Sequence, residues 1–267
     1  MNAGIVLRSC LFAAVQLLIT PPFSVIALLT FPFHPFTRYR ITLYWTRFVL
    51  LALKLICGIN FRVTGAEHLP PGPCVVLSNP QSAWETIFYC WLMPRPLIFV
   101  FKKSLLYIPF FGWGLALMSP IAIDRAKGRA ALKQIARIGT QRLQQGFWVV
   151  IYPEGTRSPD GRLYKGRTGI ARMALESGAP VVPVAMHNTA EIQPTGQVVP
   201  RVRQVEIVFG TPMYFDGDAT DQKRLREITD EIMQTIQKLS GQEYVDIYAT
   251  KAKTLQNRNE ESEIEEE

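Results

Sequence analysis

The sequence predicts an α/β protein with a mostly parallel sheet flanked by helices, preceded by an apolar helical segment. From residue 60 onward, short β-rich runs alternate with stretches of helical periodicity, as in sheets built from crossover units. The first 57 residues instead contain long apolar stretches. A chain of 267 residues can hold one large domain with an appendage. We therefore divide it into N-terminal helices (1–57), an α/β domain (58–245) and a charged tail (246–267).

The N-terminal segment is apolar enough to associate with a membrane. Between Gly4 and Phe33 the only charge is Arg8. Pro21-Pro22 is expected to interrupt the helix, because proline lacks the backbone N–H and clashes with the preceding turn. Residues 5–20 alone would span about 24 Å, short of a ~30 Å hydrocarbon core. We expect a bent span or a hairpin that dips into one leaflet; a cleaved signal peptide is disfavoured because no small-x-small site follows.

Charge is distributed unevenly along the chain. The net charge is +7, but residues 260–267 hold six of the 22 acidic residues, so the rest of the chain is strongly basic. A second apolar segment, Tyr44 to Cys57, carries Arg47 and Lys54 and resembles an interfacial helix. This combination suits an anionic membrane surface or an anionic substrate. It does not indicate nucleic acid, because zinc-finger, RNA-recognition and basic-zipper patterns are absent. The acidic tail is expected to be disordered.

Seven strands and four helices are expected after residue 58. The strands are predicted at Asn60–Thr64, Cys74–Ser78, Leu97–Phe101, Ile121–Ile123, Trp148–Tyr152, Val181–Ala185 and Val205–Phe209. The helices are predicted at Gln81–Leu92, Gly128–Gln145, Thr168–Glu176 and Asp221–Leu239.

Polar clusters follow five of the predicted strands. They are Ser78-Asn79, Lys102-Lys103, Asp124-Arg125, Glu154-Gly155-Thr156-Arg157 and His187-Asn188. Ligands of open α/β sheets bind outside the carboxyl ends of the strands, so parallel strands would gather these clusters on one rim. Its lysines and arginines suit a phosphate-bearing substrate, and Lys165, in the loop after the fourth cluster, is a further candidate.

Several other site types are not indicated. Cys10, Cys57, Cys74 and Cys90 show no C-x-x-C spacing, and all but Cys74 lie in apolar contexts. We therefore expect buried thiols in a reducing compartment, and no disulfides or metal site. The sequence has no P-loop, G-x-S-x-G or H-E-x-x-H motif, and Gly112-Trp113-Gly114 lacks a dinucleotide fingerprint's third glycine.

Four sequence blocks, read in order, resemble the glycerolipid acyltransferase family, specifically its bacterial 1-acyl-glycerol-3-phosphate acyltransferases. The blocks are Asn79 to Glu85, Ile108 to Trp113 with Pro120 to Arg125, Tyr152 to Ser158, and Val182-Pro183-Val184. The resemblance covers about residues 40–215. It implies a glycerol-3-phosphate acyltransferase-like fold. It also implies no metal or cofactor, with acyl-CoA or acyl carrier protein as the co-substrate.

The first block departs from the family pattern. In the family this block reads N-H-x-x-x-x-D, or a variant that ends in glutamate. Its histidine is taken as the general base, and its acidic residue orients the imidazole of that histidine. Here Glu85 fills the acid position, but Pro80 occupies the histidine position and cannot accept a proton. Proline suits the first helical position after Asn79, so we expect a preserved fold and an impaired active site. Of the three histidines (His34, His68 and His187), only His187 lies on the rim and is a plausible substitute.

The resemblance also suggests roles for other residues. Glu154, Gly155, Thr156 and Arg157 match the block taken to bind the acceptor's phosphate, with Arg157 its principal ligand. Asp124 and Arg125 match a block implicated in acceptor binding. Lys103 and Lys165 are weaker candidates, because an exposed lysine is often only solvated.

The sequence therefore suggests a membrane-bound enzyme of phospholipid synthesis that converts lysophosphatidate to phosphatidate, here without its base. The resemblance and charge place it on the cytoplasmic face of a bacterial inner membrane, with a membrane phospholipid surface, a lysophospholipid acceptor and an acyl donor as partners. Two alternatives remain open: a non-catalytic lipid-binding or scaffold protein, or an acyltransferase for another lysolipid such as lyso-ornithine lipid. Pro80 itself is consistent with a variant of an active enzyme or with a naturally inactive member.

Overall fold

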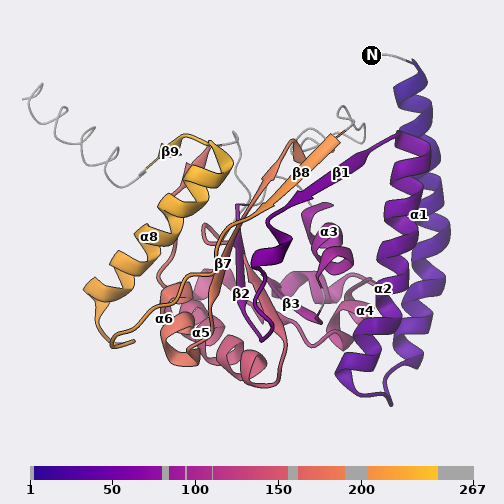
Figure 1. Cartoon of the computed structure of the whole chain (residues 1–267). Helices are drawn as coiled ribbons and strands as arrows, with labels where there is room; N and C mark the ends of the chain where they lie inside the picture. The colour runs from indigo at the N-terminus through magenta and orange to yellow at the C-terminus, as the bar shows by residue number, and fades with distance from the viewer. Residues whose placement is uncertain are drawn as a thin grey trace, which may run out of the picture.

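A seven-stranded sheet with helices on both faces forms the centre of the computed structural model (Figure 1). The structure describes residues 3–79, 84–93, 95–109, 111–155, 162–189 and 204–245. The strands of this sheet are β1 Asn60–Thr64, β2 Val75–Ser78, β3 Leu97–Lys102, β4 Ile121–Ile123, β5 Trp148–Ile151, β7 Val181–His187 and β8 Gln204–Phe209. Their order across the sheet is β1-β8-β7-β2-β5-β3-β4.

Five neighbouring strands of the sheet run in the same direction. β7, β2, β5, β3 and β4 form an unbroken parallel set. β8 is antiparallel to β7, and β1 is parallel to β8, so these two strands run the opposite way. The expected mostly parallel α/β fold is therefore confirmed. The parallel strands are also the five that the polar clusters follow, which brings the described parts of those clusters to one edge.

The sheet is buried on both faces, because alternate side chains enter two separate apolar cores. Val76, Val150 and Val182 face helices α2 and α3, whereas Val75 and Val149 face α5, α6 and α8. Strands buried on both faces read as continuous apolar runs, which is why the sequence located them well. The described helices are α1 Ala3–Leu29, α2 Pro35–Ala52, α3 Trp84–Leu92, α4 Phe111–Leu117, α5 Arg129–Gln144, α6 Gly169–Ser177 and α8 Gln222–Ser240.

Helices α1 and α2 form a hairpin that packs beside α3 and α4 (Figure 1). The expectation that Pro21-Pro22 interrupts the first helix is wrong, because α1 continues through both prolines. A tertiary contact and a local bond support the helix there: the Trp45 indole N–H of α2 donates to Thr20 Oγ1 at 3.3 Å, and within α1 Ser24 Oγ donates to Thr20 O at 2.9 Å. The hairpin turn instead follows Leu29, before α2 begins at Pro35.

Several shorter elements were not anticipated. The segment predicted as a separate interfacial helix, Tyr44 to Cys57, is the second half of α2 followed by the π-helical turn Leu53–Cys57. Helix α4 contains two glycines, which disfavour helix in isolation, but it packs against α1 with the Cβ position of Gly114 3.7 Å from Ala27 Cβ. Strands β6 (Leu163–Tyr164) and β9 (Tyr244–Val245) are two residues long and form their own parallel pair.

Candidate active site

The polar groups of the site lie at the carboxyl ends of the five parallel strands. Following the sheet order, β7 ends in His187, β2 is followed by Asn79, β5 by Tyr152 to Gly155, β3 ends in Lys102, and β4 is followed by Asp124. This edge is where ligands bind in open α/β sheets. The predicted rim therefore exists for the described residues.

Glu85 is a buried carboxylate in the first turn of α3. Its side chain is fully buried, and its Oε1 accepts a hydrogen bond of 2.7 Å from the hydroxyl of Thr189, which is also fully buried. Burying a carboxylate is costly unless hydrogen bonds and favourable dipoles compensate. The first turn of a helix supplies such a dipole, because negative charge is stabilised near the helix N-terminus.

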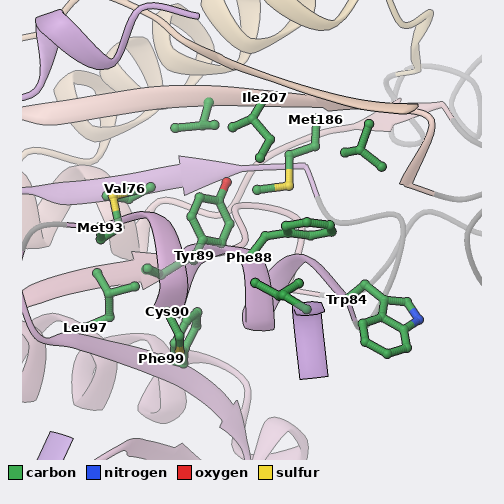
Figure 2. Close-up of a cluster of buried hydrophobic side chains, with 14 of the residues drawn as sticks. Val76, Trp84, Phe88, Tyr89, Cys90, Met93, Leu97, Phe99, Met186 and Ile207 are labelled. Carbon is green, nitrogen blue, oxygen red and sulfur yellow. The ribbon is translucent and has the colours of Figure 1, made fainter. Parts of the chain in front are cut away.

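Tyr89 lies one helical turn after Glu85, within the apolar core between α3 and the sheet. Figure 2 shows its ring among the side chains of this core, with the hydroxyl pointing toward the sheet. Burial raises the pKa of Tyr89 well above its ordinary value, and the nearby Tyr152 and Glu85 raise this pKa further. The adjacent Ser78 hydroxyl lowers the pKa, but by less than burial raises it. Tyr89 is therefore a neutral phenol within this core.

The segment after α8 reaches two parts of the site. Asn79 is buried, and its amide Nδ2 donates to Gln242 Oε1. Next along the chain, the Glu243 carbonyl accepts from Leu163 N at 2.9 Å, which begins the β6–β9 pair. The C-terminal end of the described chain thus holds both the start of the first block and the loop that follows the Glu154 block.

Glu154 and Gly155 form a tight turn after β5. The Glu154 side chain is 5% exposed, and Gly155 N donates to Tyr152 O at 2.9 Å. Gly155 has φ +75°, and a Cβ there would lie 3.0 Å from Arg167 Nε, so conformation and space both favour glycine. Arg167 Nε donates to the Glu154 carbonyl at 3.3 Å, which ties this turn to the loop before α6.

A cavity of about 790 Å³ adjoins this edge of the sheet. Most of its wall is apolar and comes from α1, α2, α3, α4, α5 and α6 together with β3. Its polar part includes Lys102, Tyr152 and Arg167, and the Tyr152 hydroxyl lies 3.4 Å from Thr86 Oγ1 on α3. The volume falls within the usual range of about 300–1,000 Å³ for small-molecule sites. The cavity can hold a long apolar group with a polar or anionic end at the rim.

The structure places the remaining predicted site residues in different settings. Lys103 is exposed and begins the 3₁₀ turn Lys103–Tyr107, outside the cavity wall. Asp124 is also exposed, and its Oδ1 accepts from Ala126 N at 3.1 Å, a local turn bond. Lys165 is half-buried in the loop between β6 and α6. Pro80, Thr156, Arg157 and the Arg125 side chain lie outside the described parts of the chain.

Three residues of the site were not singled out by the sequence. Thr189 follows the β7 cluster by one residue, so the strand-end rule could have included it. Arg167 is two residues after Lys165, in the same loop. Gln242 has no local signal, because only the folded chain brings it to Asn79. Among the described residues, no group of three or more His, Cys, Asp or Glu side chains is arranged to hold a metal ion.

Known proteins with similar sequences are acyltransferases. Residues 60–187 match the family model described as Acyltransferase. A 1-acyl-sn-glycerol-3-phosphate acyltransferase of Pseudomonas aeruginosa is 42% identical over 189 residues, covering 70% of this chain and 73% of that protein. This chain belongs to the acyltransferase family. Its members are enzymes, and the candidate site residues Asn79, Glu85 and Glu154 all lie within the matched region.

Other members of the acyltransferase family match smaller or more divergent regions. The human 1-acyl-sn-glycerol-3-phosphate acyltransferase alpha is 32% identical over 141 residues, covering 52% of this chain and 50% of that protein. The crystal structure of the 1-acyl-sn-glycerophosphate (LPA) acyltransferase PlsC from Thermotoga maritima has a TM-score of 0.69. It covers 88% of this chain and 95% of that one, at 21% identity. This second likeness confirms the fold, including the mostly parallel sheet and flanking helices.

Proposed function

We propose that this chain has the site of an acyltransferase that converts lysophosphatidate to phosphatidate in phospholipid synthesis, with acyl-CoA or acyl carrier protein as donor. The observation that carries the proposal is the junction of a large apolar cavity with a cationic rim, at the edge where the family blocks meet. The names of the Pseudomonas and human relatives support the choice of acceptor. No metal or cofactor takes part in this proposal.

The proposed reaction joins the two substrates at the rim. The sn-2 hydroxyl oxygen of the acceptor attacks the thioester carbonyl carbon, the carbon–sulfur bond breaks, and the thiol leaves with the proton that the hydroxyl loses. A base must take that proton first, and a buried carboxylate such as Glu85 would hold an imidazole base in orientation. Pro80 has no such group. We therefore expect activity to be lowered by about 10²–10⁴ relative to a chain with histidine at this position.

Cations around the rim are proposed to bind the acceptor's phosphate. Lys102 and Arg167 line the cavity, and Arg157 follows Glu154 and Gly155 in the block that the family uses for phosphate. A guanidinium offers paired donors that match phosphate oxygens. Lys103, Lys165, Asp124 and Arg125 remain candidate acceptor ligands from the sequence.

The α1–α2 hairpin is proposed to dock the enzyme on a membrane. α1 contains one segment, Gly4–Leu29, that is long and apolar enough to cross a bilayer by length and composition. Leu17 and Leu18 are about three-quarters exposed (76% and 74%), and α2 carries Arg38, Arg40 and Arg47. Apolar side chains with nearby cations favour an anionic lipid surface. The cavity wall includes residues of both helices, so an acyl chain could pass between the bilayer and the site. We propose that the α/β domain lies on the cytoplasmic face of a bacterial inner membrane.

The proposal is tested by comparing the chain with its Pro80→His variant. Acyl transfer to lysophosphatidate is measured with acyl-CoA and with acyl carrier protein as alternative donors. Activity that appears, or rises about 10²-fold or more, only with histidine supports a site that is intact except for its base. Equal activity in both chains would refute the role of position 80 and direct attention to His187. If both are inactive while folded and bound to lipid, a binding or scaffold protein is favoured.

A second acceptor class is distinguished by Arg157. A lyso-ornithine lipid has no phosphate, so an enzyme for that acceptor would not need the Arg157 guanidinium for phosphate binding. In the Pro80→His background, Arg157→Ala should raise the KM for lysophosphatidate and leave the KM for the donor close to its starting value. An unchanged acceptor KM would contradict the phosphate role.

A further inference from the structure

The hydrogen bond between Thr189 and Glu85 connects two parts of the site that are far apart in the sequence. Thr189 Oγ1 donates to Glu85 Oε1 at 2.7 Å, and both side chains have no exposed surface. A hydrogen bond to a charged group is stronger than one between neutral groups, and burial excludes the water that could replace it. The bond therefore favours one orientation of this carboxylate oxygen.

The chain direction after β7 places Thr189 in this position. β7 ends at His187, and the next residue, Asn188, has φ +66°, in the left-handed region. That conformation is unfavourable for a residue with a Cβ, although asparagine tolerates it better than most. The Asn188 amide Nδ2 donates to Gln204 O at 3.3 Å, which ties the bend to the first residue of β8. The surrounding fold thus holds a bend that directs the following side chain to Glu85.

A second feature favours an ionised Glu85 that has a defined orientation. Glu85 lies in the first turn of α3, where the helix dipole stabilises negative charge. A hydroxyl donor to the charged form has the same effect, because it favours the ionised carboxylate over the neutral acid. Both interactions offset part of the cost of burying this carboxylate.

We propose that Thr189 is a positioning residue for the acyl-transfer site: its hydroxyl holds the carboxylate of Glu85, the acid of the first family block, in one orientation. This inference rests on the proposed function. Thr189 does not touch the substrates in this scheme; it acts through Glu85. In the chain with Pro80 the pair stays assembled and the base is missing, so the effect of Thr189 becomes measurable once an imidazole is restored.

The test uses the full chain in the Pro80→His background with two changes at position 189. Thr189→Val keeps the shape and removes the hydroxyl, whereas Thr189→Ser keeps the hydroxyl and removes the methyl group. We expect Thr189→Val to lower kcat about 10- to 100-fold with little change in either KM, and Thr189→Ser to retain most of kcat. Thermal unfolding of each variant identifies a loss of activity that comes from loss of the fold.

A measurement that does not depend on turnover accompanies the assay. The pKa of the imidazole at position 80 is followed by NMR; the chain has only three native histidines, so the added signal is assigned by comparison with the Pro80 parent. A carboxylate aimed at the imidazole raises its pKa, and Glu85→Gln should abolish that rise. Thr189→Val should lower the pKa toward the Glu85→Gln value, and Thr189→Ser should preserve it.

The outcomes separate the two proposals. If the imidazole pKa follows the hydroxyl at position 189 but no variant transfers acyl groups, the positioning role stands and the proposed function fails. If Thr189→Val and Thr189→Ser give the same pKa and the same kcat, Thr189 has no positioning role, whatever the activity of the Pro80→His chain.

Discussion

Replacing Gly166 with alanine should displace the loop that carries Lys165 and Arg167. A Cβ at Gly166 would lie 2.9 Å from Met233 Cγ and Sδ and from Thr229 Cγ2, where ordinary contact begins at 3.4 Å. Met233 and Thr229 of α8 are fully or almost fully buried, so moving either side chain would disturb the core around it. The loop must therefore shift by about 0.5 Å, and the Arg226 bond to the Gly166 carbonyl, now 2.7 Å, must lengthen or tilt.

The expected cost follows from these contacts. Overpacking a core costs about 1–3 kcal/mol, and replacing glycine recovers about 0.4–1 kcal/mol through the unfolded chain. We therefore expect a net loss of about 1–2 kcal/mol, which lowers the Tm by roughly 2–8 °C in a protein of this size. A misplacement of about 1 Å of a group at the site can lower the rate about 10²-fold. A loop shift of about 0.5 Å should therefore lower kcat/KM for the acceptor about 10-fold in the Pro80→His background.

Thermal unfolding and acceptor kinetics test both parts of this prediction. Gly72→Ala is the matched control, because nothing lies within 4 Å of its Cβ position and its backbone is not left-handed. That variant should be as stable as the parent or slightly more stable, with unchanged kinetics. If Gly166→Ala behaves like Gly72→Ala in both measurements, the link between α8 packing and the site loop is wrong.

Three further predictions concern stability, the membrane and the cavity. Burial raises the pKa of Cys90 from 9.0 to about 12, so its contribution to stability is complete below pH 9 and is lost as the pH rises. Between about pH 8 and 11 this titration should lower the free energy of unfolding of the parent by about 2–3 kcal/mol. The Cys90→Ala variant should lack that part of the loss in urea unfolding. Unchanged pH dependence would contradict that burial effect. Exchanging Leu17 and Leu18 for glutamate should weaken binding to anionic vesicles at least about 100-fold in sedimentation assays, whereas Tyr214→Glu should not. Leu115→Trp narrows the cavity and should lower transfer of long acyl chains more than of short ones in the Pro80→His background; equal losses would argue against acyl binding there.

Much of the α/β fold could be predicted because its strands are buried on both faces. Such strands read as short apolar runs, and the ends of β1 and β4 fall where the sequence placed them. The polar clusters that follow the parallel strands were predicted to share one edge of the sheet, and their described parts do so beside the cavity. The family blocks, which depend on side-chain chemistry at fixed spacing, indicated the enzyme family before any contact was known.

The errors of prediction came from long-range contacts. Local rules ended the first helix at Pro21-Pro22, but packing against Trp45 supports α1 through that point. Helix α4 has a poor intrinsic propensity and exists beside α1, where its small residues allow close approach. Tertiary packing outweighed local preference in both cases.

The sequence by itself determined the fold class, the edge of the sheet that carries the candidate site, the family, and the absence of a basic side chain at Pro80. Only the tertiary structure decided that Thr189 would meet Glu85, that Gln242 would meet Asn79, and that helices of the N-terminal hairpin would share the wall of a cavity with β3 and α5. The physical reason is sequence separation. Chemistry carried by one side chain, and packing that repeats along one segment, can be read locally, whereas contacts between residues 104 and 163 positions apart exist only after the chain has folded.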